Sequence, residues 1–445
     1  MMKKTKAVSA GLAMLALAGT AFVSSPAKAA DDVKLTYWLW DSNQLPMYQA
    51  CADAFTKANP TIKVELQQKG WDDYWTGITT GFVSGTAPDV FTDHLAKYPE
   101  FATNNQIVDL APYIAKDKVD SKQYLTGLFD LWGRQGKQFG LPKDWDTIAV
   151  FYNKAMAAKA GVTDADFANA TWNPKTGGTF ETIIKKLTVD GKGKNATQAG
   201  FNKKSTKVYG LATPSGGAYG QTEWSHFAAS NGFTFNSGPW AESYNYDSPK
   251  LAETIQYIAD LSLKKGLEPA FKDIKATGHD TLFKAQKVAM ITEGSWNIGT
   301  FSKLDFPVGF ALLPTGPAGR KSMYNGLADS IWSGSKHKDE AWQFLKFVAS
   351  PACETDIVGK AGVVFPAIKT GVDNALATQK SRGLDVSAFT TEALAPGGTF
   401  LFPITDNAAA IGDIMSATMD SIRLGKEKAA PALAAANAKV NATFK

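Results

Sequence analysis

In the first hundred residues, stretches with the hydrophobic pattern of a β-strand take turns with stretches in which hydrophobic residues recur at helical spacing. A strand that ends in aromatic residues is predicted over 33–40, and a helix is predicted from Pro46 to Ala58, where apolar residues recur at intervals of three and four. Residues 62–66 alternate as a second strand, and 88–91 predict a third strand after another helix. This strand-helix-strand order predicts an α/β domain with a parallel sheet and right-handed crossovers.

Residues 141–154 combine two kinds of sequence. The second half is β-branched and aromatic, as in a buried strand, whereas the first half places Asp144 and Asp146 on either side of Trp145. A buried carboxylate needs water, a partner or a ligand. We interpret this stretch as the point where one compact unit meets another across a cleft; the alternative is a polar turn before an ordinary strand.

The length of the chain also predicts more than one unit. About 415 residues are too many for one core, so two domains are expected.

Polar and aromatic residues follow the predicted strands at the same end. In parallel sheets, ligands bind beyond the carboxyl ends of the strands, where several loops converge. An isolated tryptophan is more often part of a core, but the recurrence of this pattern favours a binding site. Aromatic rings cover the C–H faces of a neutral polyol while carboxylates accept hydrogen bonds from its hydroxyls. The candidates in this part of the chain are Trp40, Asp41, Trp71, Asp72, Asp93, His94, Asp144 and Trp145.

The second half of the chain repeats the pattern and adds further crossovers. A strand over 208–213 precedes Tyr219, and a buried strand over 288–292 precedes a second polar and aromatic cluster. Residues 323–332 have too polar a centre for a plain core strand, so we predict that they cross back to the first unit. Residues 359–367 predict a third crossover. The candidates here are Tyr219, Glu293, Trp296, Asn325 and Asp329.

The N-terminal segment predicts export. Residues 1–6 carry three lysines, 7–23 are small and apolar, and 27–29 match a signal peptidase site, so we predict a cleaved signal peptide over 1–29. No cysteine follows it, so we expect no lipid anchor and a periplasmic protein. The segment holds four lysines and no acid, so its removal lowers the formal net charge from +5 to +1. A mature chain that is nearly neutral gives no reason to expect nucleic-acid binding. No other stretch has the roughly 18 apolar residues of a membrane span.

The chain has two cysteines, Cys51 and Cys353. A disulfide between them is permitted in the periplasm but not required, because small buried thiols are also common. No zinc, nucleophile or phosphate-loop motif occurs, so we expect no catalytic residue, no metal and no cofactor. Acids among tryptophans leave an exported carbohydrate-active enzyme as an alternative, but no second acid is placed to face Asp144 and Asp146 across one bond.

Several short motifs occur in an order typical of one family. They are Gly85–Val90, Leu141-Pro142 ahead of Phe151–Lys154, Gly294-Ser295-Trp296, Glu340–Leu345 and Phe365-Pro366. Through nearly the whole mature chain the sequence resembles the sugar-binding solute-binding proteins of bacterial ATP-driven importers, the family that includes the maltose-binding protein.

The resemblance implies a type II periplasmic-binding-protein fold, in which two α/β lobes joined by crossover hinge segments close on a solute. It gives a first lobe of 30–143 plus 328–368 and a second lobe of 144–327 plus 369–445. It also implies that Trp296 stacks on a sugar ring, and that the membrane permease subunits of the importer are the protein partners. The loops after the first, second and hinge strands would supply further sugar contacts, at Trp40, Asp41, Trp71, Asp72, Asp144 and Trp145.

A neutral mono- or oligosaccharide is the expected solute, bound by a monomer. Polyols, sugar acids, glycerol phosphodiesters and polyamines remain alternatives on the same fold. An anionic solute would need arginine or lysine in the cleft, and Lys143 is the only cation immediately beside the candidate loops.

Overall fold

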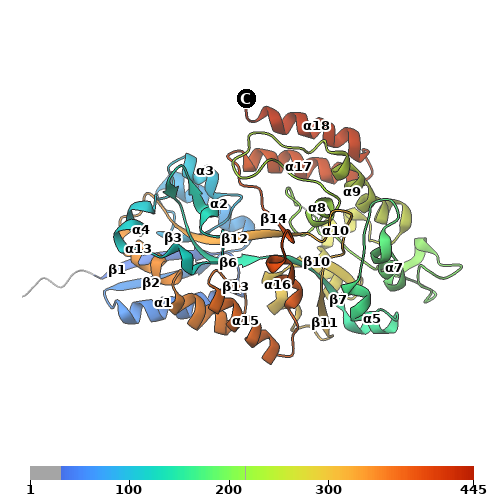
Figure 1. Ribbon diagram of the computed structural model, residues 1–445, viewed down its shortest axis with the longest axis horizontal. Coiled ribbons are helices and arrows are strands. Elements are labelled where there is room, and N and C mark those ends of the chain that lie inside the picture. The colour runs from blue at the N-terminus through green and yellow to red at the C-terminus, as the bar shows by residue number, and fades with distance from the viewer. Residues whose placement is uncertain (1–31, 216) are drawn as a thin grey trace, which may run out of the picture.

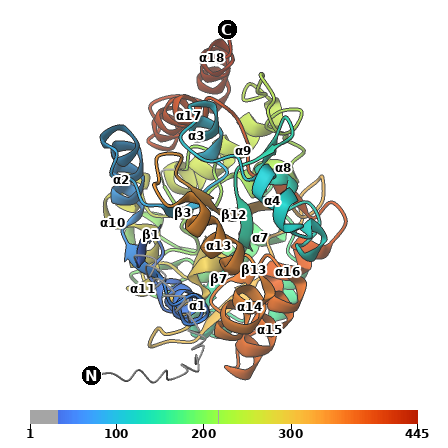
Figure 2. The same cartoon turned by 90° about the vertical axis from the view of Figure 1, so that its left-hand side faces the viewer.

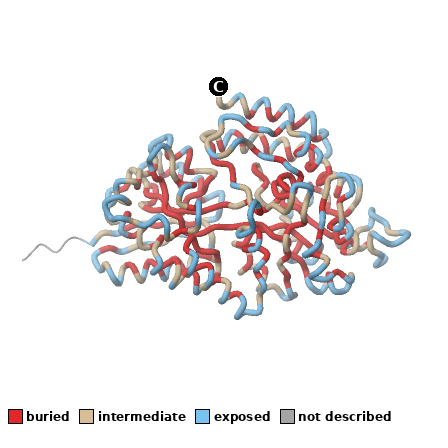
Figure 3. Tube along the Cα trace, in the orientation of Figure 1, coloured by how far each residue is buried: buried red, intermediate tan, exposed pale blue. Residues whose placement is uncertain are grey.

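The computed structural model describes residues 32–215 and 217–445, and the predicted signal peptide lies outside these ranges. Figure 1 shows two α/β lobes side by side, joined by strands that run from one lobe into the other. These connecting strands are buried along most of their length (Figure 3). Within the described ranges, no helix is both long and apolar enough to cross a membrane.

A seven-stranded sheet forms the first lobe, with the order β13-β6-β12-β3-β1-β2 and with β14 paired to β12. Strand β1 runs parallel to β2 and β3, as the alternation of strands and helices predicts. Strand β12 is antiparallel to both β3 and β6. The strands of this sheet are β1 (Val33–Leu39), β2 (Ile62–Gln68), β3 (Val90–Asp93), β6 (Leu141–Asp146), β12 (Ser322–Ile331), β13 (Phe365–Pro366) and β14 (Thr399–Leu401).

Helices cover both faces of this sheet (Figure 2). In α1 the buried residues Met47, Cys51 and Phe55 are four apart, which places them on one face, and this helix packs against α13. A short hairpin, β4 (Gly133–Arg134) and β5 (Lys137–Gln138), precedes β6. The helices are α1 (Leu45–Ala58), α2 (Trp71–Ser84), α3 (Tyr98–Thr103), α4 (Ala111–Asp117), α13 (Lys338–Val348), α14 (Pro351–Cys353) and α15 (Lys369–Ser381).

The second lobe has a smaller, three-stranded antiparallel sheet in the order β10-β7-β11. Its strands are β7 (Ile148–Asn153), β10 (Met290–Gly294) and β11 (Val308–Ala311), and a separate pair is formed by β8 (Val189–Asp190) and β9 (Thr206–Val208). Strand β7 is buried at every position, as its β-branched and aromatic sequence predicts.

The strand predicted over 208–213 is not continuous. Strand β9 ends at Val208, and beyond it only Tyr209 and Ala212 form isolated bridges, to Val288 and Ile291. A side chain at Gly210 would collide with the carbonyl oxygen of Ile184, so the chain at this point packs against α7 instead of extending a sheet.

Helices surround the smaller sheet. Helix α17 packs against α9 and α18, and these three form the upper right part of Figure 1. The helices are α5 (Lys154–Lys159), α6 (Asp164–Ala168), α7 (Gly178–Leu187), α8 (Ser225–Ser230), α9 (Pro249–Asp260), α10 (Phe271–Thr277), α11 (His279–Lys284), α12 (Ile298–Phe301), α16 (Ser387–Leu394), α17 (Ala408–Arg423) and α18 (Ala429–Ala442).

The acidic stretch around Trp145 belongs to a strand that connects the two sheets. Only Thr147 separates β6 in the large sheet from β7 in the small one, and β12 returns alongside β6. A β-bulge interrupts this pairing: Leu327 lies opposite Asp144 and Ala328 opposite Pro142, so Lys143 is the extra residue. Bulges redirect side chains and are frequent next to binding sites.

The boundaries of the two lobes stay predictions. Helix α15, which the predicted division assigns to the second lobe, packs against β13 and the π-helical turn Glu354–Gly359 of the first.

A disulfide joins Cys51 of α1 to Cys353 of α14, with the Cα atoms 5.4 Å apart, so the bond that the sequence permitted is present in the structure.

Candidate functional site: a cleft between the lobes

A cavity of about 530 Å³ lies between the carboxyl ends of β1, β2 and β3 and the loops of the second lobe. Its size is in the usual range for small-molecule sites. Residues from both lobes and from the connecting strands line it: Trp40, Asp41, Ser42, Asn43, Gln44, Trp71, His94, Asp144, Trp145, Asp146, Gln221, Ser295, Trp296, Asn297, Thr300, Asn325, Leu327 and Val364.

Four tryptophans contribute aromatic surface to the cavity. Trp40 and Trp71 meet edge to face, with ring centroids 5.1 Å apart, and Trp40 also packs on Trp75 behind them. Trp71 is 45% exposed, so its ring is available to a ligand. By contrast, Trp145 is buried and stacks on Phe365 with ring centroids 5.0 Å apart, so little of its ring is available to a ligand.

Trp296 enters the cavity from the second lobe. It lies in the short turn that follows β10, and its half-buried ring folds back over the preceding Gly294. A Cβ atom at Gly294 would lie 2.0 Å from the indole, so only glycine allows this conformation. The Gly-x-Trp motif therefore has a physical reason, which is the close approach of the ring to its own backbone.

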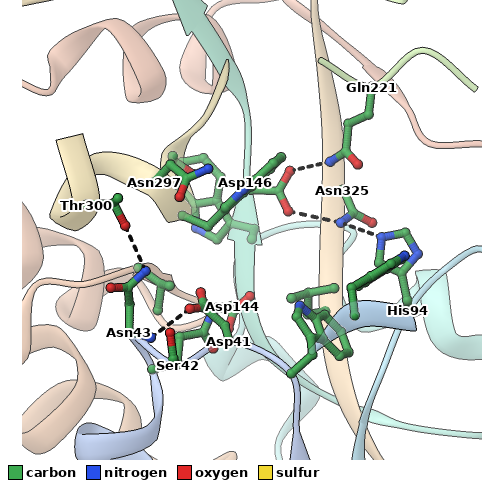
Figure 4. A pocket seen from close by; sticks show the side chains of 18 residues that line it. Asp41, Ser42, Asn43, His94, Asp144, Asp146, Gln221, Asn297, Thr300 and Asn325 are labelled. Atoms are coloured by element: carbon green, nitrogen blue, oxygen red, sulfur yellow. Dashed lines mark hydrogen bonds between the residues drawn. The ribbon is translucent and has the colours of Figure 1, made fainter. Parts of the chain in front are cut away.

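Asp146 is the centre of a row of polar side chains (Figure 4). It accepts hydrogen bonds from the Gln221 amide at 2.8 Å and from the Asn325 amide at 2.9 Å, and the same Asn325 nitrogen is 3.2 Å from Nε2 of His94. Burial raises the pKa of Asp146 well above its usual value, although the Asn325 hydrogen bond opposes this. Burial also lowers the pKa of His94 to about 3, so the imidazole is neutral.

Asp144 is only 2% exposed and lines the same cavity. Its pKa is raised to about 7 by burial, and the nearby positive charge of Lys143 offsets part of this effect. The carboxylate accepts one side-chain hydrogen bond among the described residues, a long one of 3.4 Å from the Tyr48 hydroxyl. A buried carboxylate has about four acceptor positions, so most of the hydrogen-bonding capacity of Asp144 is unused.

Asp41 holds the loop between β1 and α1 in place. Its carboxylate accepts hydrogen bonds from the backbone N–H of Asn43 at 2.8 Å and from the Gln44 side chain at 3.1 Å. Burial raises the pKa of Asp41, and these two hydrogen bonds oppose the shift. The ordered loop directs the Asn43 amide across the cleft, where it donates to the Thr300 hydroxyl at 3.1 Å (Figure 4).

Eight of the thirteen candidate residues predicted from the sequence line this cavity. They are Trp40, Asp41, Trp71, His94, Asp144, Trp145, Trp296 and Asn325. The structure brings them together from opposite halves of the chain, and their contacts with a sugar stay a prediction. The other five lie outside the lining: Asp72, Asp93, Tyr219, Glu293 and Asp329.

Two of these five have structural surroundings that explain their position. Asp72 is exposed in the first turn of α2, where a carboxylate is favoured by the helix dipole. Tyr219 is buried and donates its hydroxyl to the backbone oxygen of Ala408.

The other three are buried acids with partners in the protein. Asp93 accepts from Ser330 and has its pKa raised to about 8 by burial. Glu293 lies 2.8 Å from His279, and Asp329 forms a buried ion pair with Lys143 at 3.3 Å.

Most of the lining residues that sequence reasoning missed are neighbours of predicted ones. Ser42, Asn43 and Gln44 follow Asp41, and Ser295 and Asn297 flank Trp296, so the end-of-strand rule extends to them. Thr300 is four residues after Trp296, at the spacing of one helical turn. Gln221 lies in an irregular loop, and no periodic pattern points to it.

A sheet built from both ends of the chain, two lobes and a cavity between them define a two-lobed binding protein. The chain matches the family model of bacterial extracellular solute-binding proteins over residues 41–352 and therefore belongs to this family.

Known proteins similar to the chain cover most of its length. A binding protein of Brucella abortus is 26% identical over 98% of this chain and 97% of its own length. The diacetylchitobiose-binding protein DasA of Streptomyces coelicolor is 25% identical over 74% of this chain and 72% of its own. The substrate-binding protein Lmo0181 of Listeria monocytogenes, solved in complex with cycloalternan, superposes with a TM-score of 0.80 over 93% of this chain and 99% of that one, at 22% identity. This likeness confirms the predicted fold.

Proposed function

We propose that this protein is the periplasmic substrate-binding component of an ABC importer and that it captures a neutral mono- or oligosaccharide between its lobes. The observation that carries the proposal is the composition of the cavity lining. Tryptophans, carboxylates and side-chain amides converge there from both lobes, and no lysine or arginine is among the described residues that line the cavity.

This composition suits the chemistry of a sugar. Indole rings pack against the apolar C–H faces of a pyranose, and carboxylate and amide oxygens accept hydrogen bonds from its hydroxyls. Trp71 from the first lobe and Trp296 from the second can contact different faces or different rings of one ligand. Sugar acids and glycerol phosphodiesters are disfavoured, because a buried anion needs a cationic partner.

Delivery to a membrane permease requires that the ligand is held tightly in the closed form and weakly in the open form. Direct contacts between the lobes, such as Asn43 with Thr300, fit a closed form in which a ligand is enclosed. Several curated relatives of the chain are named as sugar-binding proteins, which supports a sugar as solute.

An enzymatic role has little support in the cleft. Glycosidases use two carboxyl groups with separated pKa values, so that one is protonated and the other ionised. Burial raises the pKa of all three acids of this cavity, Asp41, Asp144 and Asp146, so the lining does not show the pattern of one pKa shifted up and a facing one shifted down.

A thermal-shift screen of the mature protein tests the proposal. The protein is unfolded and refolded first, to remove solute carried from the host, and is then screened against neutral sugars, polyols, sugar acids, glycerol phosphodiesters and polyamines. We expect one neutral sugar to raise the melting temperature by several degrees, increasingly with concentration, because only the native state binds it. A shift with sugar acids or phosphodiesters alone, or consumption of a sugar during the assay, would contradict the proposal.

A further inference from the structure

More acidic than basic side chains surround Asp144 at the bottom of the cleft. Burial is the main cause that disfavours its ionisation, and the charges of Asp329 and Asp41 add to this effect. Glu354 is also fully buried, and burial together with the charge of Asp144 raises its pKa well above the usual value. Lys143 is the positive charge that acts on Asp144 from within the protein.

The positive charge of Lys143 is already committed to other groups. Its ammonium donates to the Tyr37 hydroxyl at 2.7 Å, to the Thr92 hydroxyl at 2.9 Å and to Asp329 at 3.3 Å. An ammonium has three N–H donors, so none remains for Asp144. The bulge that turns Lys143 toward these partners therefore leaves Asp144 without a direct cationic partner, although the two residues are adjacent in sequence.

The carboxylate of Asp144 faces the ligand space. It is nine-tenths buried and lines the cavity, and the Tyr48 hydroxyl at 3.4 Å is its one side-chain hydrogen-bond donor in the part of the chain that the structure describes. A buried carboxylate with so few protein donors costs stability unless water or a ligand in the cavity supplies them.

We infer that the site also accepts, and binds more tightly, a saccharide in which an ammonium group replaces one hydroxyl, with the ammonium at Asp144. This inference rests on the proposed function and names a further class of ligand for the same cleft. An ammonium both donates hydrogen bonds to Asp144 and supplies the counter-charge that favours its ionised form, whereas a hydroxyl only donates a hydrogen bond. The neutral His94 and the side-chain amides of the lining do not oppose a positive charge.

Matched pairs of sugars test the inference by titration calorimetry. Each pair differs only in a hydroxyl or an amine at one carbon: glucose and glucosamine, mannose and mannosamine, and galactose and galactosamine. The titrations use the mature protein at about pH 7, where most of an amine with a pKa near 7.7–8.0 is protonated. In at least one pair we expect the amine to bind about ten-fold tighter or more, the lower end of the range for a close charge pair at an interface.

Two variants assign the preference to one carboxylate. Asp144→Asn keeps the shape of the side chain but removes its charge, so the ratio of the two affinities should fall to near one. Asp73→Asn, an exposed acid in the first turn of α2, is the matched control and should leave the ratio unchanged.

The outcomes separate the inference from the proposed function. If a neutral sugar binds and no amine binds more tightly, the inference is wrong and the proposed function stands. If an amine binds more tightly but Asp144→Asn leaves the ratio unchanged, the assignment to Asp144 is wrong. If neither the neutral screen nor any pair shows binding, both are wrong.

Discussion

Arg134 and Asp406 form a bidentate ion pair, with two N–H···O distances of 2.6 Å. Arg134 belongs to the hairpin ahead of β6, and Asp406 lies between β14 and α17, so the predicted division of the chain places the two residues in different lobes. The guanidinium also lies 4.2 Å above the ring of Trp240, which is held in a left-handed backbone conformation at φ 63°. This conformation is rare for a bulky side chain, so the surrounding contacts must stabilise it.

We expect Arg134→Ala to weaken sugar binding by about 2- to 10-fold, mainly through faster dissociation. We expect the variant to lose about 1 kcal/mol of interaction between the predicted lobes, which would make the closed state less populated. Stopped-flow measurement of ligand release tests this, with Lys137→Ala in the same hairpin as control. An unchanged rate of release would mean that the pair does not stabilise the closed state.

Removal of Asp329 should destabilise the fold and leave the cleft intact. Asp329→Asn leaves the ammonium of Lys143 buried without its counter-charge, which costs about 3–5 kcal/mol of unfolding free energy. Urea unfolding measures this cost, and Lys143→Met combined with Asp329→Leu should recover a large part of it. A variant that keeps its stability but loses sugar affinity would instead place Asp329 among the ligand contacts, as the sequence predicted.

Trp296→Ala should lower sugar affinity by about 2 kcal/mol or more, as expected for a buried aromatic anchor. The ring lines the cavity from the second lobe, so its loss removes the apolar surface on that side of the ligand. Calorimetry with the sugar identified by the thermal-shift screen measures the effect. Trp38→Ala is a suitable control, because this indole lies under Lys69 and outside the cavity lining. Unchanged affinity in a folded Trp296→Ala protein would remove Trp296 from the site.

Removal of the disulfide should lower stability without changing the cleft. Cys51 and Cys353 are 302 residues apart, so their bond closes a long loop in the unfolded chain. Replacement of both by alanine should cost about 2–5 kcal/mol, although the entropic origin of this effect depends on the model used. Melting curves with and without reductant should then differ for the parent and coincide for the variant. A parent unaffected by reductant would show that the bond contributes little.

The sequence predicted the lining residues correctly where the neighbouring residues in the chain determine where a side chain lies. Trp40, Asp41 and Trp71 follow parallel strands, and the rule that ligands bind at the carboxyl ends of such strands placed them in the cavity. The β-branched run of β7 likewise predicted its complete burial. In both cases the evidence lies within a few residues of the feature.

The rule failed where a polar side chain has a partner far away in the sequence. Asp329 and Lys143 are 186 residues apart, and only the antiparallel pairing of β12 with β6 brings them together. Glu293 is the penultimate residue of β10, the strand that leads to Trp296, yet its carboxylate contacts His279 on a neighbouring helix. A single sequence does not reveal such pairings. In the sequence, Asp329 and Glu293 therefore could not be distinguished from the acids that line the cleft.

The last prediction concerns pH and Asp144. Its pKa is about 7 in the folded protein and near 4 in the unfolded chain. Between these two values the folded state retains a proton that the unfolded state has lost, so this carboxyl group lowers stability as pH rises and its full cost is present above pH 7. Asp144→Asn should therefore be more stable than the parent at about pH 8, by an amount on the order of 4 kcal/mol, and the difference should disappear near pH 4. Urea unfolding of both proteins at both pH values measures this difference in stability. The pKa shifts of the other buried groups, such as Asp93, occur in both proteins and cancel in the difference.

A variant that gains stability and loses sugar affinity would show that Asp144 is kept in an unfavourable environment because the ligand needs it. A difference in stability that does not change with pH would mean that the pKa of Asp144 is not raised.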